Sequence, residues 1–458
     1  MIKVMLSALL AMGVGFAQDA PLTPAEQEAV VKLQSAKADV RRDAAKRLGE
    51  LKSRGAGPDL AKTASGDPDA SVRRAAVVAL GRSGDRSRIP DMTAVLKDPD
   101  PKVRGGAIEG LVNLYLASDE SVFTRVRSGV IHVTPFWDER QTQVVEPYVE
   151  VDPAVTTGIA ELMRTDKVDA NRIAAVRALG ALRASSQVDA LADAMAADVK
   201  LRPEVLDAFV LIGDTEAATY AIPFFESPDA DLAVQAMIVA GRLHAAKAVV
   251  PLLTVYGSDQ PNKGIVGTVK GVFDPERKKA ALQALALIGD PRADAIFASQ
   301  DNCFDKDPDV RRACYEGLAR EGDPRYLPMV TRNSLIEKND EVRLAQTFAL
   351  YKMKQPSTFG VIMNALRERS RRDQAAQYVR EANSADDLMP FLRTPDRDAQ
   401  RVVVEALGDL GDQTTADALK PLVRGSSPEI ALAADRSIRR IEWRLANAPA
   451  PAPAPATP

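Results

Sequence analysis

One stretch of sequence returns about every thirty-one residues along this chain of 458 residues, and that repetition constrains the fold more than any other feature. Residues 67–85 read DPDASVRRAAVVALGRSGD. We call Val72 and its equivalents the reference positions: Val40, Val72, Val103, Asn171, Leu201, Leu232, Arg277, Val310, Val342, Ser370, Ala399 and Ile430. A period of about twenty to fifty residues is typical of stacked supersecondary units that cannot bury their apolar faces alone. The sequence therefore predicts one extended domain of about twelve repeats.

Each repeat is predicted to be a hairpin of two helices. Asp69 can cap a helix start, and Pro68 suits the entry turn. From Val72 to Leu80, apolar residues recur at three- and four-residue spacing, which places them on one face of a helix. Glycines at 81 and 84 end that helix, and a second amphipathic run follows at 89–96. We therefore expect an all-α fold.

Three further positions recur in most of the repeats. The core positions, eight residues after the reference positions, are Leu48, Leu80, Leu111, Leu179, Phe209, Ala240, Leu285, Leu318, Leu350, Tyr378, Leu407 and Ile438. The residue directly after the reference position is usually basic: Arg41, Arg73, Arg104, Arg172, Arg202, Lys278, Arg311, Arg343 and Arg371. Acids recur three residues before the reference position: Asp69, Asp100, Asp198, Asp229, Asp274, Asp307 and Asp396. The bases and acids predict either a ladder of ion pairs between stacked repeats or a stripe that binds anions.

The pattern DPDxxVRxxAxxALGxxGD resembles the HEAT-like repeats found in phycocyanobilin lyases and in many bacterial proteins unrelated to bilins. The resemblance covers nearly the whole chain after its first residues. It implies a right-handed α-solenoid. It carries no catalytic residue with it, because this repeat family defines packing positions and a binding surface rather than a shared active site.

The two ends of the chain differ from the repeats. Residues 1–17 have one early lysine, an apolar run and small residues before a plausible cleavage point, which is typical of a secretory signal peptide. The apolar run is short for a membrane span, and no other stretch approaches that length, so we expect no membrane span in the mature chain. Residues 18–447 are the predicted solenoid, and the Pro/Ala-rich residues 448–458 are expected to be a disordered tail. The sequence thus predicts an exported protein, periplasmic or extracellular.

Two insertions interrupt the repeats. The spacing between Val103 and Asn171 is 68 residues, and the inserted residues 118–152 are rich in valine and partly alternating, which predicts a β-hairpin in the third repeat. This insertion also gathers candidate partner-binding residues: Phe123, His132, Phe136, Trp137 and Tyr148. A second insertion, residues 257–275, is glycine-rich and is predicted to be a long loop.

Residue patterns that carry chemistry are nearly absent. His132 and His244 are the two histidines, with no HExxH pair to hold a metal, and the glycines of the second insertion are not followed by the Gly-Lys-Ser/Thr of a nucleotide loop. We expect no catalytic residue, no metal and no cofactor. The formal net charge of −3 also argues against nucleic-acid binding, which usually needs a basic domain.

The two cysteines, Cys303 and Cys314, leave two possibilities open. Export makes a disulfide chemically possible, while two separate thiols fit the sequence equally well.

The sequence favours a non-catalytic scaffold or adaptor that binds a protein or peptide along its concave face and on the inserted hairpin. One alternative is a module that binds carbohydrate or serves an exported enzyme, with Phe136, Trp137 and Tyr148 as stacking groups. A chromophore lyase is a third possibility, although the signal peptide argues against it. Neither the oligomeric state nor the partner's identity follows from the sequence.

Overall fold

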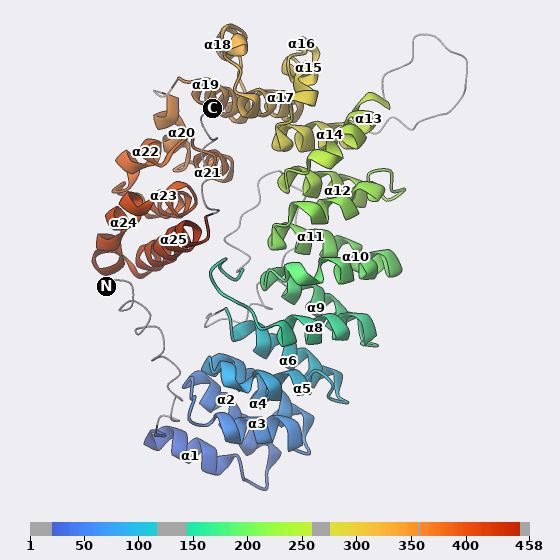
Figure 1. The fold of residues 1–458 in the computed structure, drawn as a ribbon, viewed down its shortest axis with the longest axis vertical. Helices are drawn as coiled ribbons and strands as arrows, with labels where there is room; N and C mark the ends of the chain where they lie inside the picture. Colours follow the sequence, from blue (N-terminus) through green and yellow to red (C-terminus); the bar gives the residue numbers. More distant parts are fainter. Residues whose placement is uncertain (1–20, 117–143, 259–274, 356–357, 449–458) are drawn as a thin grey trace, which may run out of the picture. The chain divides into compact units, whose positions relative to one another are not determined.

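The computed structural model describes residues 21–116, 144–258, 275–355 and 358–448 (Figure 1). These residues form helices and turns without any strand, so the all-α prediction is confirmed for this part of the chain. They group into two compact units. Unit 1 contains 21–116 and 151–187, and unit 2 contains 144–150 and the described residues from 188 onward. The predicted signal peptide lies outside the described residues.

Unit 1 consists of two layers of helices. Its α-helices are α1 (Pro24–Lys32), α2 (Ala38–Glu50), α3 (Gly57–Gly66), α4 (Ala70–Ser83), α5 (Ile89–Val95), α6 (Pro101–Asn113), α8 (Pro153–Thr165) and α9 (Asp169–Ala181), with 3-10 turns η1 (Arg86–Arg88) and η3 (Ser185–Gln187). Helices α2, α4, α6 and α9 pack side by side in one layer, and α3, α5 and α8 form the other (Figure 1). Helices α2, α4 and α6 are each followed along the chain by a second-layer helix, as in the predicted hairpins.

Unit 2 repeats the same arrangement. Its α-helices are α10 (Val188–Ala197), α11 (Arg202–Ile212), α12 (Ala230–Arg242), α13 (Val249–Ser258), α14 (Pro275–Ile288), α15 (Asp294–Phe297), α16 (Gln300–Cys303), α17 (Pro308–Glu321), α18 (Leu327–Ser334), α19 (Asp340–Lys352), α20 (Phe359–Ala365), α21 (Arg372–Arg380), α22 (Ala385–Leu388), α23 (Arg397–Leu410), α24 (Gln413–Gly425) and α25 (Pro428–Ala446). Its 3-10 turns are η4 (Val199–Leu201), η5 (Thr215–Tyr220), η6 (Ile222–Phe224), η7 (Ala246–Ala248), η8 (Pro291–Ala293), η9 (Pro324–Tyr326) and η11 (Met389–Phe391). Helices α11, α12, α14, α17, α19, α21, α23 and α25 follow one another in one layer.

The core positions test the repeat alignment directly. Ten of the twelve are completely buried: Leu48, Leu80, Leu111, Leu179, Phe209, Ala240, Leu285, Leu318, Tyr378 and Leu407. Leu350 and Ile438 are only partly buried. In the helix of Leu350, Phe348 and Tyr351 fill the core instead, and the Phe348 ring stacks on that of Tyr378 with centroids 4.1 Å apart.

A left-handed backbone position ends the first helix of eight repeats, twelve residues after the reference position. Glycine occupies it at Gly84, Gly213, Gly289 and Gly322, with φ between 65° and 75°. Lys52, Arg183, His244 and Lys354 occupy it with φ between 49° and 69°. Only glycine adopts this conformation without a steric penalty, yet four larger residues adopt it as well. The geometry of the turn therefore requires a positive φ at this position.

An arginine ladder joins consecutive repeats, as one of the two interpretations of the basic positions predicted. The fork formed by Nε and Nη2 of Arg41 binds Asp67 at 2.6 and 2.8 Å. The corresponding forks are Arg73 on Asp98, Arg104 on Asp166 and Arg311 on Glu337. In each case Nη1 donates to two backbone carbonyls in the turn before its own helix. We call Arg41, Arg73, Arg104 and Arg311 with these partners the arginine ladder.

The acids of the ladder are not those singled out by the sequence. Asp69 and Asp100, three residues before the reference position, cap helices α4 and α6 by accepting backbone N–H groups. The arginines bind the acids five residues before the reference position instead, such as Asp67 and Asp98. A carboxylate that accepts hydrogen bonds from the N-terminal amides of a helix points toward its own helix. The acid five residues before the reference position is therefore the one that binds the arginine of the neighbouring repeat.

The ladder crosses the first insertion without a break. Arg104 in α6 binds Asp166 at the end of α8, 62 residues away, with the geometry that Arg73 has with Asp98 only 25 residues away. The repeat stack therefore continues past the insertion, which leaves and re-enters it between the two helices of one repeat.

The predicted β-hairpin does not extend into the described end of the insertion; residues 117–143 lie outside the described part of the chain. Residues 144–152 contain a turn, in which the Val149 N–H donates to the Glu146 carbonyl, and no strand. Val145 is buried, and Arg440 in α25 donates to Glu146 over 2.9 Å. These valine-rich residues are therefore held by contacts to a helix rather than by a neighbouring strand.

The second insertion is slightly shorter than predicted, because α13 runs to Ser258 and α14 starts at Pro275. Residues 259–274, and 449–458 of the predicted tail, are outside the described residues.

Candidate interaction groove

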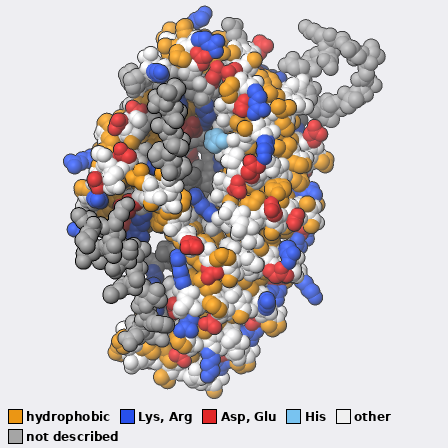
Figure 2. Space-filling view, viewed as in Figure 1, with side chains coloured by type: hydrophobic (Ala, Val, Ile, Leu, Met, Phe, Trp, Pro, Cys, Tyr) orange, Lys and Arg blue, Asp and Glu red, His pale blue; other side chains and the backbone are white. Residues whose placement is uncertain are grey.

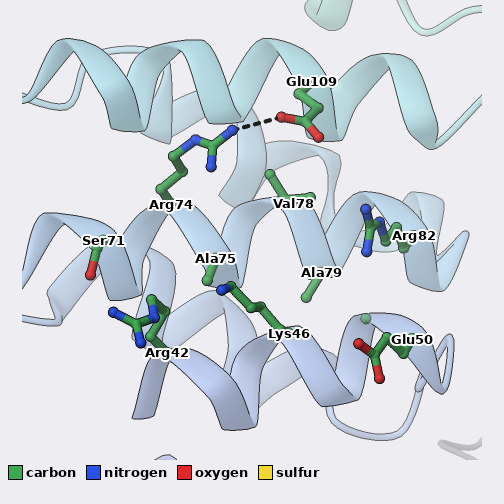
Figure 3. A pocket seen from close by; sticks show the side chains of 11 residues that line it. Arg42, Lys46, Glu50, Ser71, Arg74, Ala75, Val78, Ala79, Arg82 and Glu109 are labelled. Atoms are coloured by element: carbon green, nitrogen blue, oxygen red, sulfur yellow. Dashed lines mark hydrogen bonds and ion pairs between the residues drawn. The ribbon is translucent and has the colours of Figure 1, made fainter. Parts of the chain in front are cut away.

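A groove of about 300 Å³ lies across the first-layer helices of unit 1 (Figure 3). It is lined by Arg42, Lys46, Gly49 and Glu50 from α2, by Ser71, Arg74, Ala75, Val78, Ala79 and Arg82 from α4, and by Glu109 from α6. The groove thus runs over three consecutive repeats, so its length is set by repeat stacking.

The floor of the groove consists of small residues that allow two helices to approach closely. A Cβ atom at Gly49 would lie 3.0 Å from the Cα of Ala79, so α2 and α4 touch there almost backbone to backbone. Ala75 and Ala79 are buried, and Val78 is partly exposed. The result is a shallow apolar floor with long side chains along its edges (Figure 3).

Arg74 crosses from α4 to α6. Its Nη2 donates to Glu109 Oε2 over 3.0 Å, and a Cβ atom at Gly106 would come within 2.7 Å of the Arg74 side chain. Glycine at 106 therefore lets the arginine lie across α6. The Arg74 side chain is still half exposed, so the guanidinium keeps donors available to a ligand.

Of the other cations of the groove, Lys46 is exposed, and Arg42 and Arg82 are partly exposed. Arg42 donates to Asp43 over 3.2 Å, and the Lys46 ammonium lies 3.9 Å from that same carboxylate. These are exposed pairs, which contribute little to stability and exchange readily with other carboxylates. Arg82 adds a guanidinium on α4 (Figure 3).

The lining therefore carries four cationic side chains, Arg42, Lys46, Arg74 and Arg82, against the carboxylates of Glu50 and Glu109. Arginine forks match carboxylates, and a shallow apolar floor accommodates small side chains between them. The arrangement can bind an extended segment that carries several carboxylates. On the face of the molecule drawn in Figure 2, Lys and Arg are interspersed with Asp and Glu.

A second polar cluster lies in unit 2, buried among α17, α19 and α21. The Tyr378 hydroxyl donates to Glu316 Oε1 over 2.5 Å and accepts from Gln374 Nε2 over 2.8 Å. Burial raises the pKa of the Glu316 carboxyl and raises that of the Tyr378 hydroxyl. Both side chains are almost inaccessible to solvent, so they are poorly placed to meet a substrate.

The same cluster contains a buried ion pair. Arg320 Nε and Nη2 donate to Glu381 over 2.9 and 2.7 Å, and Nη1 donates to the Ala286 carbonyl. Burial alone would raise the pKa of Glu381, but the charge of Arg320 outweighs it and lowers that pKa. The pair joins α17 to the residue just after α21, two repeats along the chain, so removing either partner would leave an uncompensated buried charge.

Most of the partner-binding residues predicted in the insertion, namely Phe123, His132, Phe136 and Trp137, lie outside the described residues. Tyr148 is partly buried, and burial raises the pKa of its hydroxyl, with Arg436 and Arg439 of α25 close enough to oppose that rise. The described member of this group thus lies against a helix of unit 2.

The structure joins Cys303 and Cys314 in a disulfide, with the two Cα atoms 5.5 Å apart. Both residues are buried. Within the described residues, no group of three or more His, Cys, Asp and Glu side chains could hold a metal ion. His244 is exposed and occupies the left-handed turn position.

None of the described helices combines the length and the apolarity needed to cross a bilayer.

The groove would have been difficult to find from the sequence. The basic positions noted there, such as Arg41 and Arg73, are engaged in the ladder. The groove uses the next residues along, Arg42 and Arg74, whose recurrence two residues after the reference position is the signal that could have revealed it.

Comparison with known proteins supports the repeat assignment over both units. A family model for HEAT repeats matches residues 27–112 and 271–351. This chain contains HEAT repeats. The first matched segment of HEAT repeats includes every residue that lines the groove.

Two solved structures of other proteins are similar to this chain at low identity. Yeast importin-beta is 12% identical, with 92% of this chain and 57% of that chain covered and a TM-score of 0.48. The complex of CpcE and CpcF of phycocyanin lyase from Nostoc is 18% identical, with 75% of this chain and 99% of that chain covered and a TM-score of 0.24. No curated protein matches the chain.

Proposed function

We propose that this protein is a non-catalytic HEAT-repeat scaffold that binds acidic segments of a partner protein in the groove over α2, α4 and α6. The single observation that carries the proposal is the composition of that groove, in which four cations line a floor of small residues. HEAT repeats expose long surfaces built from successive helices, and such surfaces suit extended ligands.

We further propose that the repeats form one right-handed solenoid of about twelve units, with the groove on its concave face. In this proposal the chain is exported to the periplasm or beyond, because residues 1–17 resemble a signal peptide. The first insertion would add specificity, since insertions in solenoids often lie on the binding face.

Charge reversal tests the groove. The variant Arg42→Glu/Arg74→Glu should lose binding of a fluorescent glutamate-rich peptide, measured by anisotropy, and the wild-type affinity should fall with rising salt. The matched control is Lys62→Glu/Lys97→Glu, which makes the same charge change at exposed positions in and just after the second layer. Equal loss in both variants would show a general charge effect and would overturn the assignment to this groove.

The role of the insertion needs a separate variant, and the structure fixes its boundaries. Residues 144–152 cannot be included, because Val145 is buried, Glu146 binds Arg440, and the Asp152 N–H donates to Tyr115. Replacing 118–143 with a short Gly/Ser linker should leave the melting temperature unchanged and reduce retention of the partner. A linker variant that melts normally and retains the partner fully would remove the insertion from the binding surface.

A further inference from the structure

A second kind of ion pair joins consecutive repeats in unit 2, in addition to the arginine ladder. The cation stands two residues after a reference position, and the acid stands directly before the next reference position. These pairs are Lys279 with Asp309, Arg312 with Glu341 and Arg372 with Asp398, at 3.7, 2.9 and 2.9 Å. Arg401, at the same position in α23, binds Glu405 of its own helix instead. We call the three pairs between repeats the first-turn pairs.

The acids of the first-turn pairs lie in the first turns of α17, α19 and α23. The positive end of the helix dipole favours an acid at such a place. In unit 1 the same positions hold Ser71 in α4 and Lys102 in α6, and neither of these helices has an acid in its first turn. Two carboxylates that the equivalent repeats of unit 2 contain are therefore missing from unit 1.

The cations that correspond to these two missing acids belong to the groove. Arg42 and Arg74 stand two residues after their reference positions, where Arg312 and Arg372 stand in unit 2. The side chain is 36% exposed at Arg42 and 50% exposed at Arg74. At Arg312 and Arg372 it is only 6% and 27% exposed. Without the two acids, the groove cations are thus more accessible to a ligand than their equivalents in unit 2.

Other acids near the groove do not take the place of the missing two. Asp69 and Asp100 cap α4 and α6, but unit 2 has the equivalent caps Asp307 and Asp396 in addition to its first-turn acids. The three remaining acids already have basic partners: Asp43 with Arg42, Glu50 with Arg47 and Glu109 with Arg74. The difference between the groove and the equivalent repeats of unit 2 is therefore the two first-turn carboxylates.

We propose that an acidic segment of the partner supplies these two carboxylates. One carboxylate binds Arg42 beside Ser71 of α4, and the other binds Arg74 beside Lys102 of α6. Each guanidinium offers several donors to its carboxylate, and Lys102 adds a positive charge where unit 2 has an acid. This inference rests on the proposed function and adds to it the spacing of the acids in the partner.

The spacing of the acids follows from the spacing of the repeats. Ser71 and Lys102 hold equivalent positions on α4 and α6, which pack against each other, and packed helices lie about 8–10 Å apart. A polyproline II segment has about three residues per turn and rises about 3.1 Å per residue, so side chains three residues apart point the same way about 9 Å from each other. In a β-strand, side chains on one face are separated by about 7 or 14 Å. The ligand is therefore a polyproline II segment with acids three residues apart.

Two peptides of the same composition test this spacing on the wild-type protein. One consists of four Glu-Pro-Ser units, which place an acid at every third residue. The other consists of two Glu-Glu-Pro-Pro-Ser-Ser units, in which no two acids are three residues apart. The first peptide should bind about fivefold tighter or more in fluorescence anisotropy, because it presents carboxylates to both arginines at once.

Placing the missing acids in the protein tests the position. The variant Ser71→Asp/Lys102→Glu gives α4 and α6 the first-turn acids of unit 2, so its own carboxylates occupy Arg42 and Arg74. It should bind the first peptide about tenfold more weakly or worse, and it should melt no lower than the wild type. The matched control, Ser65→Asp/Lys97→Glu, makes the same charge change at exposed positions in α3 and just after α5. The control should bind the peptide within about twofold of the wild type.

The outcomes separate this inference from the proposed function. A wild type that binds both peptides equally, or an acid variant that binds no more weakly than its control, would overturn the inference and leave an acidic ligand in the groove. A wild type that binds neither peptide would overturn the proposed function as well. The peptide comparison uses only the wild type, so it remains decisive even if the acid variant fails to fold.

Discussion

Replacing Arg104 with alanine should destabilise unit 1 by about 3 kcal/mol, because the change breaks a buried ion pair and leaves one partner behind. The Arg104 fork binds Asp166 at 2.7 Å through both nitrogens, and Nη1 donates to the carbonyls of Asp98 and Pro99. The side chain of Arg104 is 17% exposed and that of Asp166 is fully buried. The alanine variant keeps the buried carboxylate and removes its countercharge.

Arg104→Lys should cost less, about 1–2 kcal/mol, since an ammonium retains the charge but cannot form the fork or reach both carbonyls. Urea denaturation followed by circular dichroism at neutral pH gives both values.

The pH dependence follows from the carboxyl group. Burial would raise the pKa of Asp166, but the Arg104 fork, the Val168 N–H and the Asn171 amide outweigh it and lower that pKa from 3.8 to about 2. Between those values the folded state binds fewer protons than the unfolded state. The pair therefore contributes about 2 kcal/mol above about pH 4, and this contribution is lost as the pH falls toward 2. The difference in the free energy of unfolding between the wild type and Arg104→Ala should therefore become smaller as the pH falls from 4 toward 2.

Arg343 provides the matched control. It occupies the same repeat position as Arg104, but its pair with Asp340 spans 3.3 Å and both side chains are more than half exposed. Arg343→Ala should change the stability by less than about 0.5 kcal/mol. Equal losses of stability in the Arg104→Ala and Arg343→Ala variants would refute the role assigned to the ladder. So would a stability difference between the wild type and Arg104→Ala that does not depend on pH.

Three other perturbations test separate features of the fold. Gly81→Ala should destabilise the protein by about 2–3 kcal/mol in urea denaturation, because a Cβ atom there would lie 2.0 Å from the Gly110 carbonyl oxygen and force α4 from α6. Lys354→Gly should stabilise the protein by about 0.5–1 kcal/mol, because the left-handed conformation at φ 69° is unfavourable for lysine and not for glycine. An unchanged melting temperature would contradict this prediction. Thiol titration of the denatured, unreduced protein should find no free thiol at Cys303 or Cys314. Reducing the disulfide should lower the free energy of unfolding by about 3 kcal/mol.

Much of the fold could be predicted because the repeat is periodic. The reference and core positions describe local helix faces, so Leu80 and its equivalents are buried as expected. Leu350 shows the limit of that reasoning, because the larger rings of Phe348 and Tyr351 displace it from the core.

The interactions between repeats were harder to predict. Periodicity marks Asp69 and Arg73 as recurrent, but it does not say that Asp69 turns to its own helix while Arg73 reaches Asp98. The groove depends on Arg42 and Arg74 lying over close helix contacts at Gly49. Such contacts arise from distances between helices, which a pattern along one helix does not contain.

The most direct test of the proposed scaffold is site-specific photo-crosslinking in cells. A photoreactive residue at Val78, on the groove floor, should yield an adduct with an acidic protein, and the adduct should disappear in the Arg42→Glu/Arg74→Glu background. The same photoreactive residue at Lys62, in the second layer, should not give that adduct. An adduct from Val78 that survives charge reversal, or the same adduct from Lys62 alone, would contradict binding in the groove.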